Sequence, residues 1–227
     1  MLARGTVAEI LKINPVSPEP EPIARAAGLI QQGCVVAIPT DTVYGLAADP
    51  FNNVAVARLF AIKGRPPDSP VLLLVDSMEM AAGLSKNLPA SFHALAERYW
   101  PGPLTIVVEA SERIPGIITA NTGRVGIRHP AAAIPQALVR AVGGPITGTS
   151  ANLSGHSDCR SARQVEIALG KVVPLILDGG PSGDEVPSTV VSLRGYSWEL
   201  IREGAIRRAE LDIFSRDEDI LGGTGLA

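Results

Sequence analysis

Short apolar runs alternate along this chain with segments of helical spacing, and this alternation limits the choice of fold more than any other feature. The run from Cys34 to Ile38 lies between Gly33 and Pro39, which is typical of a buried strand. Similar runs predict strands over residues 71–75, 104–108, 125–127, 145–149, 175–177, 189–193 and 198–202.

The segments between these runs are predicted to be helices. Pro22 suits the first turn of a helix that ends at Gly33, with Ile23, Ala27 and Ile30 on one face. Further helices are predicted from a cap at Asn53 to Lys63, after a cap at Asp76, over 89–99, over 134–142 and after a cap at Ser161.

Strands that alternate with helices predict an α/β fold, with a mostly mixed sheet and flanking helices. Neither a repeat nor an obvious linker divides the chain, so we expect a single domain over residues 21–208. Residues 1–20 become rich in proline and glutamate and are expected to be an extended lead-in. Residues 209–227 are charged, then rich in glycine, and are expected to be a mobile tail.

Composition excludes several classes of protein. Apolar residues make up 46% of the chain, enough for a large core, while a net charge of −3 removes any global attraction to nucleic acid. Cys34 and Cys159 are too few for a disulfide framework, and Cys34 is expected to be a buried small hydrophobe. Every apolar stretch is too short to span a bilayer and no signal peptide is evident, so we expect a cytoplasmic protein without a membrane partner.

Two fixed cations follow the second predicted helix. Lys63 and Arg65 could complement the dipole of that helix at its C-terminus, and this alternative stays open beside a binding role. Gly64 and Pro66 fix the backbone between and after them, which favours side chains aimed at a ligand. A nucleoside triphosphate would suit the point charge of lysine and the forked donors of arginine.

A hydroxyl-rich loop follows the strand predicted over 145–149. Ser150, Asn152 and Ser154 could form a local turn that satisfies its own backbone. Thr147 and Thr149 add more hydroxyls than such a turn needs. Ligands favour the carboxyl ends of strands in open α/β sheets, so the loop also fits phosphate or carboxylate oxygens.

Two further segments have the same two interpretations. Residues 40–45 hold one carboxylate, Asp41, and could be an ordinary polar turn. Arg128 ends a predicted strand just before His129-Pro130, where it could bind a substrate carboxylate or pair with a neighbouring acid, and Arg202 has the same ambiguity. The chain has neither a P-loop nor a Gly-x-Ser-x-Gly motif, and its three histidines are scattered, so no metal site is predicted.

Several ordered motifs resemble the YrdC/YciO-like family, whose best-understood members are threonylcarbamoyl-AMP synthases. The resemblance covers about residues 20–205. It rests on Pro39-Thr40-Asp41-Thr42-Val43-Tyr44-Gly45-Leu46, Lys63-Gly64-Arg65-Pro66, Trp100-Pro101-Gly102-Pro103-Leu104-Thr105, Gly126-Ile127-Arg128, Thr149-Ser150-Ala151-Asn152-Leu153-Ser154-Gly155, Ser188-Thr189-Val190-Val191 and Arg202-Glu203-Gly204.

The resemblance implies one twisted α/β domain with a large concave cavity. It also implies the synthesis of threonylcarbamoyl-AMP and pyrophosphate from L-threonine, bicarbonate and ATP, with Mg²⁺ carried by ATP. A tRNA-modifying transferase complex would then accept the product. Carried over by motif, the ATP-binding residues would be Lys63, Arg65, Ser69, Ser150, Asn152 and Arg202, with Lys63 and Arg65 also catalytic, and the threonine-binding residues would be Thr42, Arg128 and Ser188.

This chain departs from the family pattern in ways that leave a second hypothesis open. Leu74 replaces a histidine of the family, Arg124 replaces a common threonine, and Asp158 replaces a common serine. The alternative is a YciO-type RNA-binding module of the same fold without synthase activity. Its contact with tRNA or other RNA would use a local basic rim of Arg124, Arg160, Arg163, Arg207 and Arg208.

Overall fold

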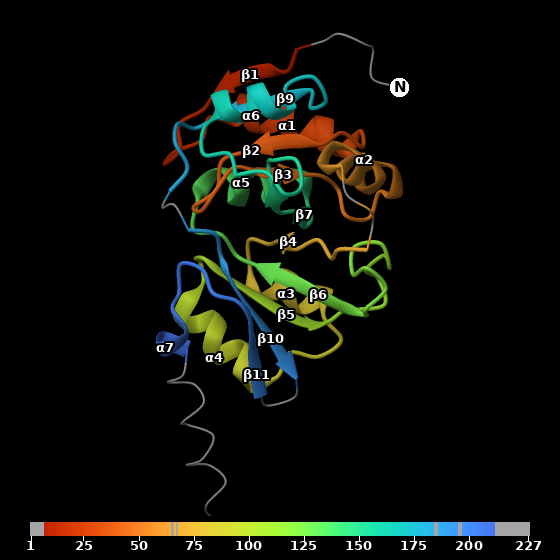
Figure 1. Cartoon of the computed structure of the whole chain (residues 1–227), viewed down its shortest axis with the longest axis vertical. Helices are drawn as coiled ribbons and strands as arrows, with labels where there is room; N and C mark the ends of the chain where they lie inside the picture. Colours follow the sequence, from red (N-terminus) through yellow and green to blue (C-terminus); the bar gives the residue numbers. More distant parts are fainter. Residues whose placement is uncertain (1–6, 65, 67, 184–185, 195–196, 212–227) are drawn as a thin grey trace, which may run out of the picture.

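The computed structural model describes residues 7–64, 66, 68–183, 186–194 and 197–211, and its strands form two mixed sheets stacked along the long axis of the molecule (Figure 1). The first sheet has the order β1 (Glu9–Lys12), β9 (Leu175–Asp178), β2 (Val36–Ile38), β3 (Gly45–Ala47) and β8 (Thr149–Ser150). The second has the order β11 (Ser197–Arg202), β10 (Thr189–Arg194), β5 (Leu104–Glu109), β6 (Arg124–Arg128), β4 (Leu73–Leu74) and β7 (Ile146–Thr147). The predicted α/β class is confirmed, with the strands divided between two sheets.

The helices of the described residues flank these sheets. They are α1 (Pro20–Gln31), α2 (Asn53–Lys63), α3 (Met78–Leu84), α4 (Ala90–Tyr99), α5 (Ala133–Val142), α6 (Ala162–Leu169) and α7 (Arg208–Leu211). The segment expected as an extended lead-in contains β1, which pairs in parallel with β9. The expected tail falls mostly outside the described residues.

The first sheet is covered on both faces, which explains why its central strands are apolar throughout. Successive side chains of a strand point to opposite faces. Val36 and Ile38 of β2 pack in the core that holds α1 and α5, whereas Ala37 between them belongs to the core that holds α2 and α6. The strands β2 and β9 therefore read as continuous apolar runs, the pattern of parallel strands buried on both sides.

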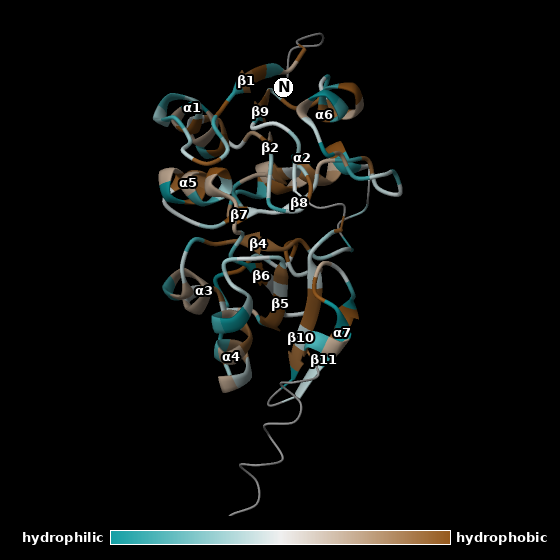
Figure 2. Cartoon of the chain, turned by 90° about the vertical axis from the view of Figure 1, so that its left-hand side faces the viewer, coloured by the Kyte–Doolittle hydropathy of each residue, from teal (hydrophilic) through white to brown (hydrophobic). Residues whose placement is uncertain are grey.

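The helices of the described residues that pack on the second sheet cover one of its faces. Ile106 and Val108 of β5 share a core with Val125 and Ile127 of β6 and with the buried side chains of α3 and α4. Figure 2 shows α3 and α4 together on one side of these apolar strands. The alternate positions of the same strands are left to line the other face.

The two sheets meet where β7 passes into β8 through Gly148. A Cβ at Gly148 would lie 2.7 Å from side-chain carbons of Leu72 and Leu74, so the close approach of these chains requires glycine. Next to it, the fully buried Thr147 hydroxyl donates to Leu46 O at 2.9 Å and accepts from Ala48 N at 2.9 Å. One segment predicted as a single strand therefore supplies a short strand to each sheet.

Most predicted helix starts agree with the structure, with two corrections. The cap of α2 is Asn52, whose side chain accepts from Val54 N and Ala55 N, and not Asn53. The cap of α3 is Ser77, which accepts from Met80 N, and not Asp76. In both cases the neighbouring residue reaches the free amides of the first turn. Ser161 caps α6 as predicted.

The two cysteines differ in burial. Cys159 is buried, but Cys34 is only half-buried, so the prediction that Cys34 is a core residue is wrong. Cys34 precedes β2 and lines a small apolar pocket of about 230 Å³ with Ile62 and Pro174.

Candidate active site

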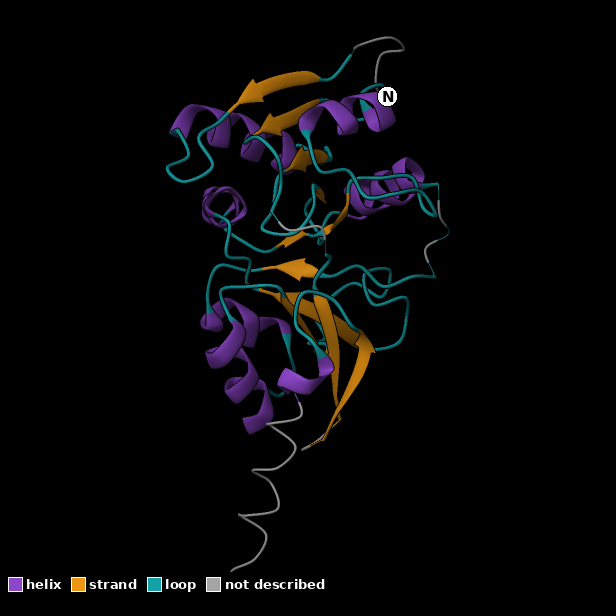
Figure 3. Ribbon diagram, turned by 60° about the vertical axis from the view of Figure 1, so that its left-hand side comes forward, coloured by secondary structure: helices purple, strands orange, loops and turns teal. Residues whose placement is uncertain are grey.

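A cavity of about 750 Å³ lies over the uncovered face of the second sheet. Figure 3 shows loops that lie between the two sheets on one side of the molecule. The residues proposed from the sequence come together here: the cavity is lined by Thr42, Lys63, Ser69, Arg128, Ser150, Asn152, Ser188 and Arg202. Arg65, also proposed, lies outside the described residues.

The floor of the cavity follows from the alternation of side chains along three strands. Except for Glu109 at the end of β5, the residues of β5, β6 and β10 that do not face the helices face the cavity instead. These are Thr105, Val107, Arg124, Gly126, Arg128, Val190, Ser192 and Arg194. A Cβ at Gly126 would lie 3.2 Å from Thr105 Cγ2, so a side chain there would crowd the floor.

The lining is strongly cationic although the whole chain carries a net charge of −3. Among the described lining residues Asp158 is the one acid, and the cations are Lys63, Arg124, Arg128, Arg194 and Arg202. Such a concentration of one sign of charge in a concave site favours an anionic ligand.

Lys63 ends α2 and reaches back across the wall of the cavity. Its Nζ donates to Ser150 O at 2.6 Å, Asn152 Oδ1 at 3.0 Å and Asn152 O at 3.1 Å, and the side chain is buried. Gly64 then takes a left-handed conformation (φ 61°), and Lys63 O accepts from Ser154 N at 2.9 Å. Lys63 therefore holds the hydroxyl-rich loop as well as lining the cavity.

The loop after β8 is a turn that satisfies much of its own polarity. Asn152 Oδ1 accepts from Ser150 Oγ at 2.7 Å, and Asn152 Nδ2 donates to His156 O at 2.5 Å. The local-turn alternative thus describes the buried amide of Asn152. The Ser150 side chain lines the cavity and is half-buried, so its hydroxyl is more accessible to a ligand than the buried amide of Asn152.

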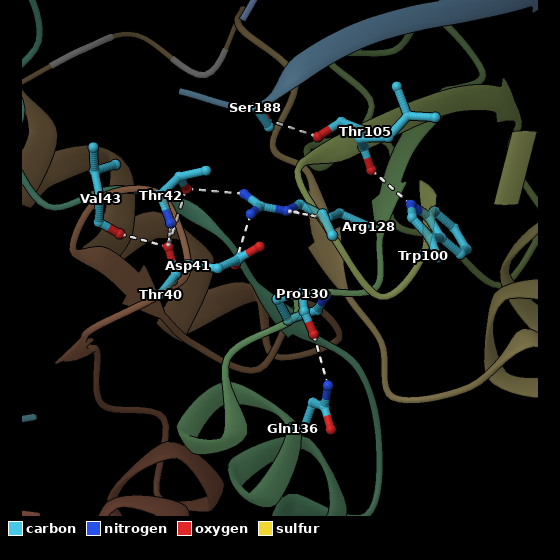
Figure 4. Close-up of polar contacts among 12 residues, drawn as sticks. Thr40, Asp41, Thr42, Val43, Trp100, Thr105, Arg128, Pro130, Gln136 and Ser188 are labelled. Carbon is cyan, nitrogen blue, oxygen red and sulfur yellow. Dashed lines mark hydrogen bonds and ion pairs between the residues drawn. The ribbon is translucent and has the colours of Figure 1, made fainter. Parts of the chain in front are cut away.

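Arg128 ends β6 at the base of the cavity and is held from three sides (Figure 4). Its Nη2 lies 2.6 Å from Asp41 Oδ1, its Nη1 donates to Thr42 Oγ1 at 3.0 Å, and its Nε donates to Gly102 O at 3.0 Å. The pairing with a neighbouring acid, left open by the sequence, is present. Arg128 also lines the cavity, although only 4% of its surface is exposed.

Ser188 connects the floor of the cavity to its rim. Its hydroxyl lies 3.0 Å from Thr105 Oγ1 and accepts from Arg202 Nη2 at 3.1 Å, while Ser188 O accepts from Arg202 Nε and Nη2. Ser188 is buried, and Arg202 is exposed at the rim. Neither side chain depends on a ligand to be placed.

Sequence reasoning did not place Thr105, Arg124 or Arg194 among the substrate-binding residues, and it gave Arg124 only a place in the basic rim of the RNA-binding alternative. Arg124 Nη2 donates to Val107 O at 3.1 Å and Ser192 Oγ at 3.0 Å, which ties β6 to β5 and β10 across the floor. The period of two along β6, and from Ser188 along β10, could have identified Arg124 and Arg194, because they share a face with Arg128 and Ser188. Thr105 lies on β5, where the sequence predicted no site residue.

Among the described residues, no three His, Cys, Asp or Glu side chains cluster as a metal site. In the same part of the chain, none of the helices is long and apolar enough to cross a membrane.

The arrangement of cavity and motifs agrees with the comparisons to known proteins. The model of the Sua5/YciO/YrdC family, described as telomere recombination, matches residues 28–204. A threonylcarbamoyl-AMP synthase of Pyrococcus abyssi is 40% identical over 190 residues, which cover 84% of this chain and 56% of that protein. One of Vibrio cholerae is 34% identical over 186 residues, covering 81% of this chain and 98% of that protein.

Solved structures show the same relationship. The crystal structure of P. abyssi Sua5 complexed with L-threonine has a TM-score of 0.88 at 35% identity, covering 96% of this chain and 65% of that chain. The crystal structure of Escherichia coli YciO has a TM-score of 0.81 at 26% identity, covering 88% of this chain and 97% of that chain. This chain spans little more than half of the P. abyssi synthase. The shared fold, the ordered motifs and the family match over most of its length show that this chain belongs to the Sua5/YciO/YrdC family.

Proposed function

We propose that this chain is a threonylcarbamoyl-AMP synthase, a nucleotidyltransferase that joins L-threonine, bicarbonate and ATP. The observation that carries the proposal is the cationic cavity, in which the residues of both expected substrate sites meet. The likeness to curated synthases and to a Sua5 structure with L-threonine bound supports it.

The cavity suits two anionic substrates that must be held close together. Lys63, Ser150, Asn152 and Arg202 would face the triphosphate from the loops and the rim, together with Ser69 and Arg65. Thr42, Arg128 and Ser188 would face threonine at the base, with Arg128 taking the carboxylate. The amine of threonine would attack the carbon of bicarbonate, giving a carbamate and water. A carbamate oxygen would then attack the α-phosphorus of ATP, and the bond to pyrophosphate would break.

The protein would contribute positioning and charge stabilisation in this reaction. Mg²⁺ would enter with ATP and neutralise charge on the phosphates. Magnesium is commonly held by substrate phosphates and one or two carboxylates, and Asp158 is the described carboxylate that lines the cavity. The donor set therefore fits a substrate-borne ion.

The product would pass to a tRNA-modifying transferase complex, and a cytoplasmic location stays a prediction. The basic rim of the RNA-binding alternative gains little support. Arg163 is paired with Glu166 and Arg207 with Glu203, while Arg124 lies in the cavity. The alternative remains testable by fluorescence anisotropy with labelled tRNA.

The test is pyrophosphate release with ATP, L-threonine and bicarbonate, followed by omission of each substrate in turn. Release that needs all three, and that falls with L-valine or L-serine in place of threonine, supports the proposal. Release without threonine, or tRNA binding without any turnover, contradicts it.

A further inference from the structure

We infer that Asp41 is a positioning residue that sets how Arg128 presents its guanidinium to the carboxylate of an amino-acid substrate. The inference deepens the proposed function and rests on it. Asp41 belongs to a family-like motif, yet the proposed reaction gives its carboxylate no role.

Asp41 lies behind Arg128 as seen from the cavity. Arg128 lines the cavity, whereas Asp41 is not among the described lining residues. Both carboxylate oxygens of Asp41 are enclosed, and Oδ1 lies 2.6 Å from Arg128 Nη2. A ligand in the cavity therefore meets Arg128, and Asp41 acts on it only through Arg128 (Figure 4).

The residues that contact Arg128 lie next to strands of both sheets. Asp41 and Thr42 follow β2 of the first sheet, while Gly102 precedes β5 of the second. Each guanidinium nitrogen thus has one oxygen of the chain within 3.0 Å. Nη2 is enclosed beside Asp41, and Nε has one N–H, which it donates to Gly102 O, so the donor left for a ligand carboxylate is the second N–H of Nη1.

The Asp41–Arg128 ion pair is not explained by its contribution to folding stability alone. A buried ion pair loses about as much to desolvation as it gains in attraction. A guanidinium that is already ordered does lose less freedom when a ligand binds, which raises affinity. The planar fork of arginine benefits most, because its recognition of a carboxylate depends on direction.

The two possible roles of Asp41 predict opposite changes in threonine affinity when Asp41 is replaced by asparagine. If Asp41 acted only through its charge, Asp41→Asn would leave Arg128 more attractive to an anion and would tighten threonine binding. If Asp41 positions Arg128, the same substitution frees the guanidinium and weakens threonine binding. We expect the dissociation constant and the KM for threonine to rise about 10- to 100-fold, the scale of one charged hydrogen bond. The dissociation constant for MgATP without threonine should stay within threefold.

The experiment is calorimetric titration of L-threonine and of MgATP into the wild-type protein, Asp41→Asn, Asp41→Glu and Glu9→Gln. Glu9→Gln is the matched control, since it removes one carboxylate from the exposed ion pair with Arg25. It changes net charge equally and should leave both affinities unchanged. Asp41→Glu keeps the charge but displaces it, and should weaken threonine binding by a smaller factor.

The outcomes separate the inference from the proposed function. If the wild-type protein binds no threonine, the proposed function fails and the inference fails with it. If the wild-type protein binds threonine and Asp41→Asn binds it equally or more tightly, only the inference is overturned. If Asp41→Asn does not fold, Asp41→Glu decides: at least threefold weaker threonine binding supports the inference, and unchanged binding refutes it.

Discussion

Lys63 Nζ donates to the carbonyl oxygen of Ser150 at 2.6 Å, which joins the last turn of α2 to the end of β8. The same ammonium group donates to two oxygens of Asn152. The buried ammonium group of Lys63 therefore links α2 to the loop that follows β8 and lines the cavity. The role in catalysis proposed for Lys63 would therefore be combined with a role in holding this loop in place.

Removal of this cation should lower both stability and turnover. Lys63→Met keeps most of the side-chain volume but leaves buried oxygens without a donor, which should cost about 1–3 kcal/mol of unfolding free energy. Lost charge stabilisation should lower turnover by about 10²–10³-fold. Urea unfolding and pyrophosphate release measure the two effects, with Lys86→Met at the exposed Glu112 ion pair as the control. An unchanged turnover would exclude a catalytic role for Lys63.

A lysine in place of Arg128 should weaken threonine binding selectively. A lysine ammonium is a compact point charge and cannot reproduce the planar fork that spans Asp41, Thr42 and Gly102. We expect Arg128→Lys to reduce the binding free energy of threonine by about 1.5–3 kcal/mol. ATP binding without threonine should change little by calorimetry. Loss of ATP binding with intact threonine binding would assign Arg128 to the other substrate.

The hydroxyl of Thr147 should matter for stability rather than for chemistry. Thr147→Val keeps the shape but leaves Leu46 O without its donor and Ala48 N without its acceptor, both in the core between the sheets. The cost should be about 1–3 kcal/mol in urea unfolding. Ser197→Ala on the exposed end of β11 is the control. Specific activity of the folded variant should be unchanged, and a stability within error of the wild type would refute this role.

His129 should make the protein less stable in acid. Burial lowers the pKa of its imidazole below the ordinary 6.5, despite the opposing field of Asp76. The unfolded chain therefore binds a proton more readily than the folded chain, so stability falls as the pH falls below about 6.5 and stops falling below the folded pKa. His129→Gln should reduce this fall between pH 7.5 and 5.5, measured by urea unfolding. The difference between the two proteins should be constant from pH 7.5 to 8.5, and equal slopes in acid would contradict the prediction.

Much of the secondary structure could be predicted because local periodicity is set by burial. The helix expected from Pro22 is observed as α1 (Pro20–Gln31), and Ile23, Ala27 and Ile30, which were predicted to share one face, are all buried. Strand β3 was missed, because Gly45–Ala47 is too short to show a period. The run over 71–75 was predicted as a full strand, but only Leu73–Leu74 pairs with neighbours.

The sequence by itself determined the chemistry of the cavity: which hydroxyls, amides and cations are available, and which of them follow strands or end a helix. The tertiary structure decided how they are used. It placed Asp41 behind Arg128, turned Lys63 onto the backbone of Ser150, and aligned Arg124 and Arg194 with the floor. These relationships join residues far apart in the chain, and they depend on how two sheets stack, whereas local patterns record only which side of each element is buried.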